Sequence, residues 1–180
     1  MRNTTSLVAL VAILSASASA GTYFIDNFCP FPMYLQSTST PADGAVPLVS
    51  LPANTPNAYL EIMRDAGYSI NALTLSRTPD MAAPMQATYH QTTTGPAPGY
   101  NFYALSTIFG DPLMAEGFQL LTQPDGFGLN CPPRSAGQAC PYTYSPSNPN
   151  GTDAVYYEND LEDLRLTLCK FNQNGTADSA

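Results

Sequence analysis

The chain of 180 residues is poor in basic residues and in charge altogether. It has six lysine and arginine residues against 14 aspartate and glutamate residues, and Lys170 is its one lysine. The net charge of −8 repels nucleic-acid phosphates and anionic lipid surfaces, so we expect neither as a partner. Only 11% of the residues are charged, while 17 prolines and 12 glycines supply many turns, a composition that favours short strands over long helices.

Histidine is nearly absent, and tryptophan is absent. A Ser-His-Asp or Cys-His site would have to use His90, the single histidine, and no Gly-x-Ser-x-Gly motif accompanies it. The alternation from Met85 to His90 places this histidine on the polar side of a strand, which favours an exposed strand residue over a catalytic one. One histidine also argues against an ordinary zinc or copper centre, so we expect no metal and no cofactor.

Long hydrophobic runs are missing as well, and we expect no segment that spans a membrane, because spanning takes about 20 apolar residues. The short apolar run Leu7–Leu14 follows the basic Arg2 and precedes Ala18-Ser19-Ala20. This order is typical of a signal peptide with its small-residue cleavage site. We predict a signal peptide at residues 1–20, a mature chain that begins at Gly21, and a secreted protein of the extracellular space or cell wall.

Beyond this leader we predict one domain over residues 21–171 and a flexible polar tail over residues 172–180. About 160 residues suffice for one hydrophobic core, and we expect a monomer. Export would also expose the chain to N-glycosylation. Sequons at Asn150 and Asn174 lie in polar, glycine-containing segments, so a glycoprotein is expected, with unused sequons as the alternative.

Export favours disulfides, and the four cysteines permit three pairings. We favour a bridge from Cys29 to Cys169, between the first and last predicted strands, and a bridge from Cys131 to Cys140 that closes a short ring rich in Pro, Gly and Ser. Cys169 has the opposite parity to the leucines of the last strand, Leu164, Leu166 and Leu168. The end-to-end bridge is therefore expected at an edge of the sheet, away from the main core face.

Short β-rich runs separated by proline and glycine clusters recur along the chain. Residues 123–149 are expected to be irregular. Eight or nine short strands without a clear long helix predict an all-β antiparallel sandwich. The predicted strands cover residues 22–28, 33–37, 46–51, 58–62, 68–75, 85–90, 100–107, 117–121 and 164–169.

Three motifs resemble those of thaumatin-like proteins. They are Asp26-Asn27-Phe28-Cys29-Pro30-Phe31, then Asn101-Phe102-Tyr103-Ala104-Leu105-Ser106 with Gly110-Asp111-Pro112, and Cys140-Pro141-Tyr142 ahead of the last cysteine. The chain is most similar to the short fungal, Blastomyces-type yeast-phase-specific secreted proteins, a compact relation of thaumatin. The resemblance covers nearly all of residues 22–171. It implies a thaumatin-like β-sandwich with a disulfide between the first and last strands.

The resemblance also implies a glucan-binding cleft, but without the acids that hydrolysis needs. Thaumatin-like proteins are associated with binding β-1,3-glucan, and some with cleaving it, through an acidic cleft. Glycoside hydrolysis requires two carboxyl groups at one bond. Gln86 and Ala104 stand where two of the cleft acids would be, while Arg77 can stand in for the cleft arginine. We therefore expect a protein without catalytic residues.

The sequence thus predicts a secreted protein that binds carbohydrate such as β-glucan, or a host extracellular protein, at the fungal cell wall or a host surface. The predicted binding residues are Arg77, Gln86, Tyr103 and Asp111. Two alternatives stay open. One is a weak β-1,3-glucanase with rearranged carboxylates, drawn from Glu61, Asp65, Asp80 and Asp111. The other is an effector or inhibitor that binds a host extracellular protein.

Overall fold

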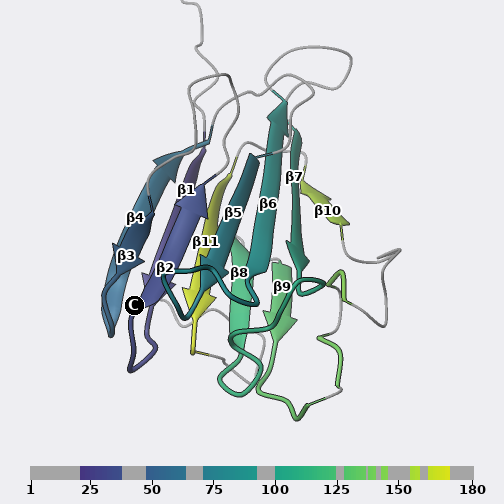
Figure 1. Ribbon diagram of the computed structural model, residues 1–180. Coiled ribbons are helices and arrows are strands. Elements are labelled where there is room, and N and C mark those ends of the chain that lie inside the picture. Colours follow the sequence, from purple (N-terminus) through teal and green to yellow (C-terminus); the bar gives the residue numbers. More distant parts are fainter. Residues whose placement is uncertain are drawn as a thin grey trace, which may run out of the picture.

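The structure, a computed structural model, is an all-β protein, as predicted. Eleven strands form two sheets, and no helix occurs within the residues that are described (Figure 1). The predicted signal peptide, both sequons and the predicted tail lie outside those residues. The described residues are 21–37, 48–63, 71–92, 100–124, 128–136, 138–140, 143–145, 155–158 and 162–170.

The five-stranded sheet places the first and last strands side by side at its centre. Its order is β4 (Thr55–Ile62), β1 (Thr22–Asn27), β11 (Asp163–Leu168), β8 (Phe118–Gln123) and β9 (Gly128–Cys131). β1 and β11 run parallel, so the predicted antiparallel arrangement is wrong for this pair, whereas the other neighbours in this sheet are antiparallel. Two segments that are far apart in the sequence therefore form the middle of the sheet.

The six-stranded sheet is antiparallel throughout. Its order is β10 (Val155–Glu158), β7 (Tyr100–Ser106), β6 (Met85–Thr92), β5 (Asn71–Ser76), β2 (Met33–Ser37) and β3 (Val49–Leu51). β5, β6 and β7 form a meander of three consecutive strands. This sheet lies in front of the five-stranded sheet in Figure 1.

Sequence patterns missed two strands. β9 lies in the stretch that was predicted to be irregular, and β10 was not predicted at all. Both have four residues and lie at a sheet edge, where β9 pairs with β8 and β10 with β7. Such short edge strands depend on a longer neighbour for their hydrogen bonds, so their own sequence carries little periodic signal.

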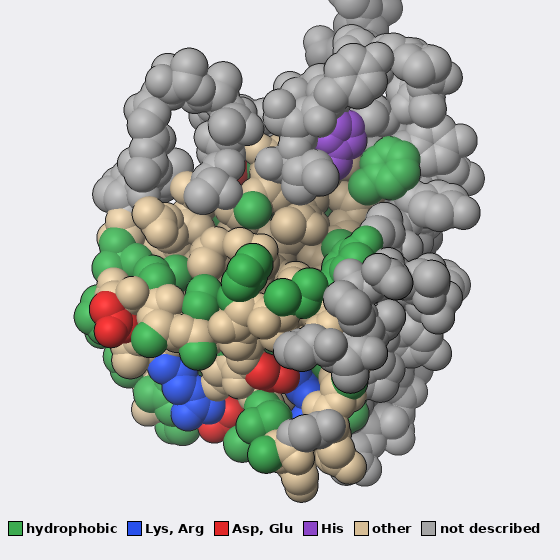
Figure 2. All heavy atoms as spheres, turned by 45° about the vertical axis from the view of Figure 1, so that its right-hand side comes forward, with side chains coloured by type: hydrophobic (Ala, Val, Ile, Leu, Met, Phe, Trp, Pro, Cys, Tyr) green, Lys and Arg blue, Asp and Glu red, His purple; other side chains and the backbone are tan. Residues whose placement is uncertain are grey.

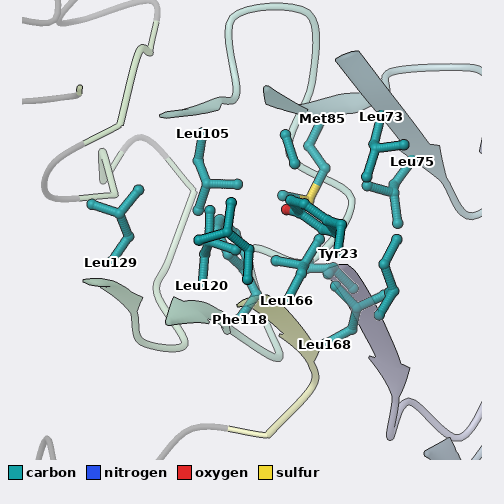
Figure 3. Packing of buried hydrophobic residues seen from close by; sticks show 14 of the residues in the cluster. Tyr23, Leu73, Leu75, Met85, Leu105, Phe118, Leu120, Leu129, Leu166 and Leu168 are labelled. Carbon is teal, nitrogen blue, oxygen red and sulfur yellow. The ribbon is translucent and has the colours of Figure 1, made fainter. Parts of the chain in front are cut away.

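The hydrophobic core lies between the two sheets (Figure 3). Alternate residues point inward in strands such as β2 and β5, as a period of two requires. The three leucines of β11 are fully buried, which confirms their predicted inward orientation. Burial of a leucine side chain stabilises the fold by roughly 1.5–3 kcal/mol. The buried set labelled in Figure 3 includes Tyr23, Leu73, Leu75, Met85, Leu105, Phe118, Leu120, Leu129, Leu166 and Leu168.

Both predicted disulfides are present, with Cα–Cα distances of 4.9 Å for Cys29–Cys169 and 5.4 Å for Cys131–Cys140. The predicted edge position of the first bridge is wrong. It lies at the end of the two central strands, and Cys29 is fully buried in the core. The parity argument fails because β11 ends at Leu168 and Cys169 has a positive φ of 59°, so the strand alternation does not extend to it.

The first of the three motifs has a structural role. Asn27 is fully buried, and its Nδ2 donates to the backbone oxygens of Phe31, Leu51 and Pro52 at 2.9–3.2 Å. Its Oδ1 accepts the backbone N–H of Cys29 at 3.1 Å. The side-chain amide of Asn27 thus connects the turn after β1 to the end of β3. Loss of these hydrogen bonds would destabilise the fold, because a buried polar group would be left without partners.

A polar cluster joins the sheets at the opposite end of β1. Glu61 on β4 accepts hydrogen bonds from Tyr89 on β6 at 2.5 Å and from Ser37 on β2 at 3.2 Å, both from the six-stranded sheet. Tyr59 on β4 donates to the same carboxylate at 2.6 Å. The ring of Tyr23 lies 5.4 Å from that of Tyr89. Glu61, one of the candidates for a rearranged acid pair, is therefore occupied by three donors, and two of them, Tyr89 and Ser37, connect the sheets.

This environment also holds the tyrosines in their neutral form. Burial, and to a smaller extent the charge of Glu61, raises the pKa of Tyr23 far above its ordinary value. Burial followed by the hydrogen bond to Glu61 does the same to the pKa of Tyr59 and of Tyr89. A negative phenolate would be desolvated and would face a negative carboxylate.

We expect the free energy of unfolding to fall as the pH rises above about 10, the ordinary pKa of tyrosine. The unfolded chain loses its phenolic protons there while the folded chain keeps them, so the folded state binds more protons and stability decreases with pH. Urea unfolding across this range, followed by far-ultraviolet circular dichroism, measures the effect. Tyr23→Phe removes one of the buried phenols, and its stability should fall less steeply with pH than that of the wild type. An equal slope in both proteins would contradict this assignment.

The two disulfides should contribute unequally to stability. In the chain-entropy model, removing Cys29–Cys169 costs up to about 5 kcal/mol and removing Cys131–Cys140 up to about 2.7 kcal/mol, because the first closes a far longer loop. Urea unfolding of the two double Cys→Ala variants tests the order. A larger loss for the variant without Cys131–Cys140 would show that loop length does not decide their contributions.

Candidate functional site

The four predicted binding residues do not lie on one surface. Tyr103 on β7 points into the core and is 1% exposed. Gln86 on β6 points to the outer face, opposite Thr74 on one neighbouring strand and Ser106 on the other. Because side chains alternate between faces, Tyr103 cannot contact a ligand that lies beside Gln86 on the outer face.

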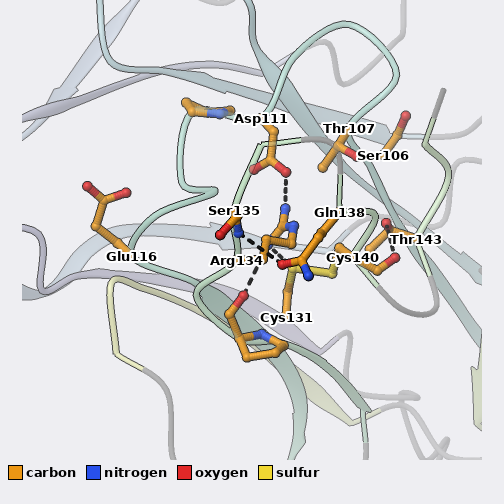
Figure 4. A network of polar contacts seen from close by, with 12 residues as sticks. Ser106, Thr107, Asp111, Glu116, Cys131, Arg134, Ser135, Gln138, Cys140 and Thr143 are labelled. Carbon is orange, nitrogen blue, oxygen red and sulfur yellow. Dashed lines mark hydrogen bonds and ion pairs between the residues drawn. A yellow bond between two sulfur atoms is a disulfide. The ribbon is translucent and has the colours of Figure 1, made fainter. Parts of the chain in front are cut away.

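Asp111 belongs to the loop of residues 107–117, which connects β7 to β8. Its carboxylate forms an ion pair with Arg134, whose side chain is only 4% exposed (Figure 4). Arg134 also donates to the backbone oxygen of Pro132 at 3.2 Å and lies over the ring of Phe118, 5.7 Å from its centroid. Burial lowers the pKa of Arg134, because a charged guanidinium loses hydration there. Asp111 thus fastens the loop to the segment that carries the Cys131–Cys140 disulfide.

Arg77 fastens the same loop from its other side. Its guanidinium forms an ion pair with Glu116 and donates from Nε to the backbone oxygen of Pro112 at 2.5 Å. It also lies over the ring of Phe31, 4.3 Å from the centroid. The residue that was predicted as a cleft arginine therefore makes three contacts within the protein, and these connect the turn after β1 with the 107–117 loop.

The loop presents two exposed apolar residues at its tip. Ile108 is 39% exposed and Phe109 is 64% exposed. Gly110 follows directly and packs against Ala83, which lies in the turn between β5 and β6. A Cβ on residue 110 would lie 2.1 Å from the carbonyl oxygen of Ala83, so only glycine fits there. The backbone N–H of Thr107 donates to the backbone oxygen of Tyr144 at 2.7 Å. An apolar tip is thus held on a well-anchored loop.

Sequence reasoning missed this apolar tip. A usable signal was present: two adjacent apolar residues, Ile108 and Phe109, stand between the end of a strand and a Gly-Asp-Pro turn. Apolar residues at such a position are outside the strand pattern and are candidates for exposure.

The outer face of the six-stranded sheet has a different character. Figure 2 shows this side of the molecule, where most of the visible charged side chains lie toward the lower part. The ring of His90 packs against Phe102 at 6.0 Å on this face. None of the side chains described on the strands of this face is Asp, Glu, Lys or Arg. They are Tyr34, Gln36, Ser50, Ala72, Thr74, Gln86, Thr88, His90, Phe102, Ala104 and Ser106.

Three of the four candidate carboxylates for a rearranged catalytic pair have structural partners. Asp80 accepts hydrogen bonds from Thr78 and from the backbone of Ala82 within its own turn, and these bonds lower its pKa. Asp111 is paired with Arg134, and Glu61 is held by tyrosines. Asp65 lies outside the described residues.

Two searches gave negative results for the part of the chain that the structure describes. Histidine, cysteine, aspartate and glutamate side chains nowhere gather in a group of three that could hold a metal ion. No helix in this part has the length and apolar character needed to cross a membrane.

Comparison with solved structures finds a similar fold in the protein elicitor MoHrip2 from Magnaporthe oryzae. The TM-score is 0.64 at 25% sequence identity, over 84% of this chain and 100% of that chain. Comparison with curated proteins finds no match. The family model for Bys1, the Blastomyces yeast-phase-specific protein, matches residues 10–170. This match confirms the predicted resemblance to that family, whereas the wider relation to thaumatin-like proteins stays a prediction. The chain belongs to the Bys1 family of Blastomyces yeast-phase-specific proteins.

Proposed function

We propose that this chain is a secreted, effector-like fungal protein that acts by binding rather than by catalysis. Its family and its structural similarity to a fungal elicitor support this function. Its two disulfides are consistent with an extracellular protein. The candidate carboxylates that are described are engaged in holding loops and sheets, which favours binding over hydrolysis. The finer thaumatin-like relation is part of the same proposal.

The apolar tip formed by Ile108 and Phe109 carries the proposal for a protein partner. A few aromatic and aliphatic anchors supply most of the binding energy of a protein interface, and they act best when they are already in place. Phe109 is the most exposed of the large apolar side chains described. The contacts of Asp111 and Arg77 order the loop before binding, so less conformational entropy is lost in the complex.

The surroundings of the tip fit a host extracellular protein with an apolar pocket. Two ion pairs, Asp111–Arg134 and Arg77–Glu116, flank the loop, and the charges neutralise one another within each pair. The tip therefore stands on a locally balanced surface of an otherwise acidic protein. An apolar pocket of the partner could bury the ring of Phe109 against apolar atoms. The charged residues beside the loop would remain paired within this protein, so no unpaired charge would be buried at the interface.

We expect Phe109→Ala to raise the protein concentration needed for a half-maximal response of host tissue at least about tenfold. A loss of this size is typical of an interface hot spot. The measurement is the protein concentration that gives a half-maximal oxidative burst in infiltrated leaf tissue. Ile62→Ala is the matched control, because Ile62 on β4 is similarly exposed, at 61%, but lies on the other sheet. Equal losses for the two variants would contradict the assignment to the loop tip, and a wild type without any response would contradict the effector-like function.

A second candidate function is binding of a neutral polysaccharide by the outer face of the six-stranded sheet. The observation that favours it is the absence of acidic and basic side chains among those described there, in a protein of net charge −8. Hydroxyl, amide and ring groups match a ligand that presents hydroxyls and C–H faces but no charge. Gln86 belongs to this face, whereas Tyr103 does not.

For this second candidate, a carboxylate introduced into the face should abolish binding, because it would be desolvated without a partner. Sedimentation with insoluble β-1,3-glucan measures the bound fraction of Thr88→Glu. Gln119→Glu, which places the same charge on the outer side of β8 in the other sheet, should bind like the wild type. A wild type that stays in the supernatant would overturn glucan binding and leave the protein-partner proposal standing. A reducing-sugar assay on the same glucan distinguishes binding from hydrolysis.

A further inference from the structure

The start of β1 is packed more tightly than the start of an ordinary surface strand. Gly21 is buried, and its carbonyl oxygen accepts the backbone N–H of Met63 at 2.8 Å. The next backbone nitrogen, that of Thr22, donates to the carboxylate of Asp163 at 2.6 Å. Gly21 is thus enclosed between Met63, which follows β4, and Glu162, which precedes β11.

Only glycine fits at this position. A Cβ on residue 21 would lie 2.5 Å from the backbone oxygen of Glu162 and 2.5 Å from the terminal methyl carbon of Met63. The methionine could move, but the carbonyl oxygen precedes the central strand β11 and is held by the backbone. The sequence that precedes this glycine is Ala18-Ser19-Ala20, the small-residue pattern at which a signal peptidase cuts.

We propose that cleavage between Ala20 and Gly21 is a maturation step that completes the fold, because it creates an α-ammonium group that binds the carboxylate of Asp163. Hydrolysis of this peptide bond consumes one water, leaves a carboxylate on Ala20 and leaves the ammonium on Gly21. The new charge arises one residue before the backbone nitrogen that already contacts Asp163. A charge-assisted hydrogen bond is stronger than one between neutral groups, so the ammonium adds a second and stronger donor to the carboxylate that Thr22 already contacts.

Cleavage would therefore fasten the second end of the central strand pair. The Cys29–Cys169 disulfide connects β1 and β11 where β1 ends. The ammonium of Gly21 and the carboxylate of Asp163 connect the same two strands where β1 begins. Before cleavage this position holds a neutral peptide group, so the precursor is less stable than the mature protein. The inference concerns maturation and is independent of the binding partner.

The test is a double-mutant cycle in urea at neutral pH. Four proteins are compared: the chain that starts at Gly21 with a free amine, the same chain with an acetylated Gly21, and both forms carrying Asp163→Asn. All four carry Lys170→Arg, which removes the single lysine and leaves the α-amine as the one amine to acetylate. We expect acetylation to lower the folding equilibrium constant about tenfold in the pair that retains Asp163 and less than about twofold in the pair that carries the substitution.

Two results would overturn the inference. Equal effects of acetylation in the two backgrounds would show that the ammonium does not interact with Asp163. Amino-terminal sequencing of the protein secreted by a fungal host should start at Gly21, and any other start would place the new charge elsewhere. Asp163→Asn keeps an oxygen acceptor for the N–H of Thr22, so all four proteins should fold and the comparison stays informative.

Discussion

The parallel pairing of β1 with β11 is the interaction on which the rest of the structure depends. It places the two ends of the domain in the middle of one sheet, with β4 on one side and β8 and β9 on the other. Such a long-range contact requires closure of nearly the whole chain, which carries a large entropic cost. The Cys29–Cys169 disulfide offsets much of that cost by restricting the unfolded chain. The core leucines of β11 are buried only when this pairing has formed.

Charged residues in this protein serve mainly to hold loops and sheets in place. Arg134 and Arg77 anchor the 107–117 loop from two sides, and Glu61 joins the sheets by accepting hydrogen bonds from Tyr89 and Ser37. With few charges available, nearly every described one has an intramolecular partner. What the described surface offers to a partner is therefore apolar or neutral: the exposed Phe109 at a loop tip and the uncharged side chains described on the outer face of the six-stranded sheet. Both features suit recognition better than proton transfer.

The sequence predicted the frame better than the site. Alternation marked the buried leucines of β11, and the cysteine positions favoured the pairing that is observed. Prediction failed where tertiary neighbours decide the outcome. β9 and β10 form because longer neighbouring strands supply their hydrogen bonds. The positive φ of Cys169 ends the alternation of inward and outward side chains at Leu168, one residue earlier than predicted. Tyr103 was assigned to a binding surface although its strand turns it into the core.

Composition, turn residues and two-residue periodicity by themselves determined that this protein is an all-β domain, because these properties are local, while four cysteines and predicted export favoured two disulfides. The face that each side chain occupies and the partner that each charge finds were decided only by the tertiary structure. Asp111 meets Arg134, Arg77 meets Glu116 and Glu61 meets Tyr89 across separate loops and strands. No local pattern encodes such contacts, since they depend on how two sheets stack and where their loops meet. The exposure of the loop tip was also decided there, although two adjacent apolar residues before a Gly-Asp-Pro turn are a local signal for it.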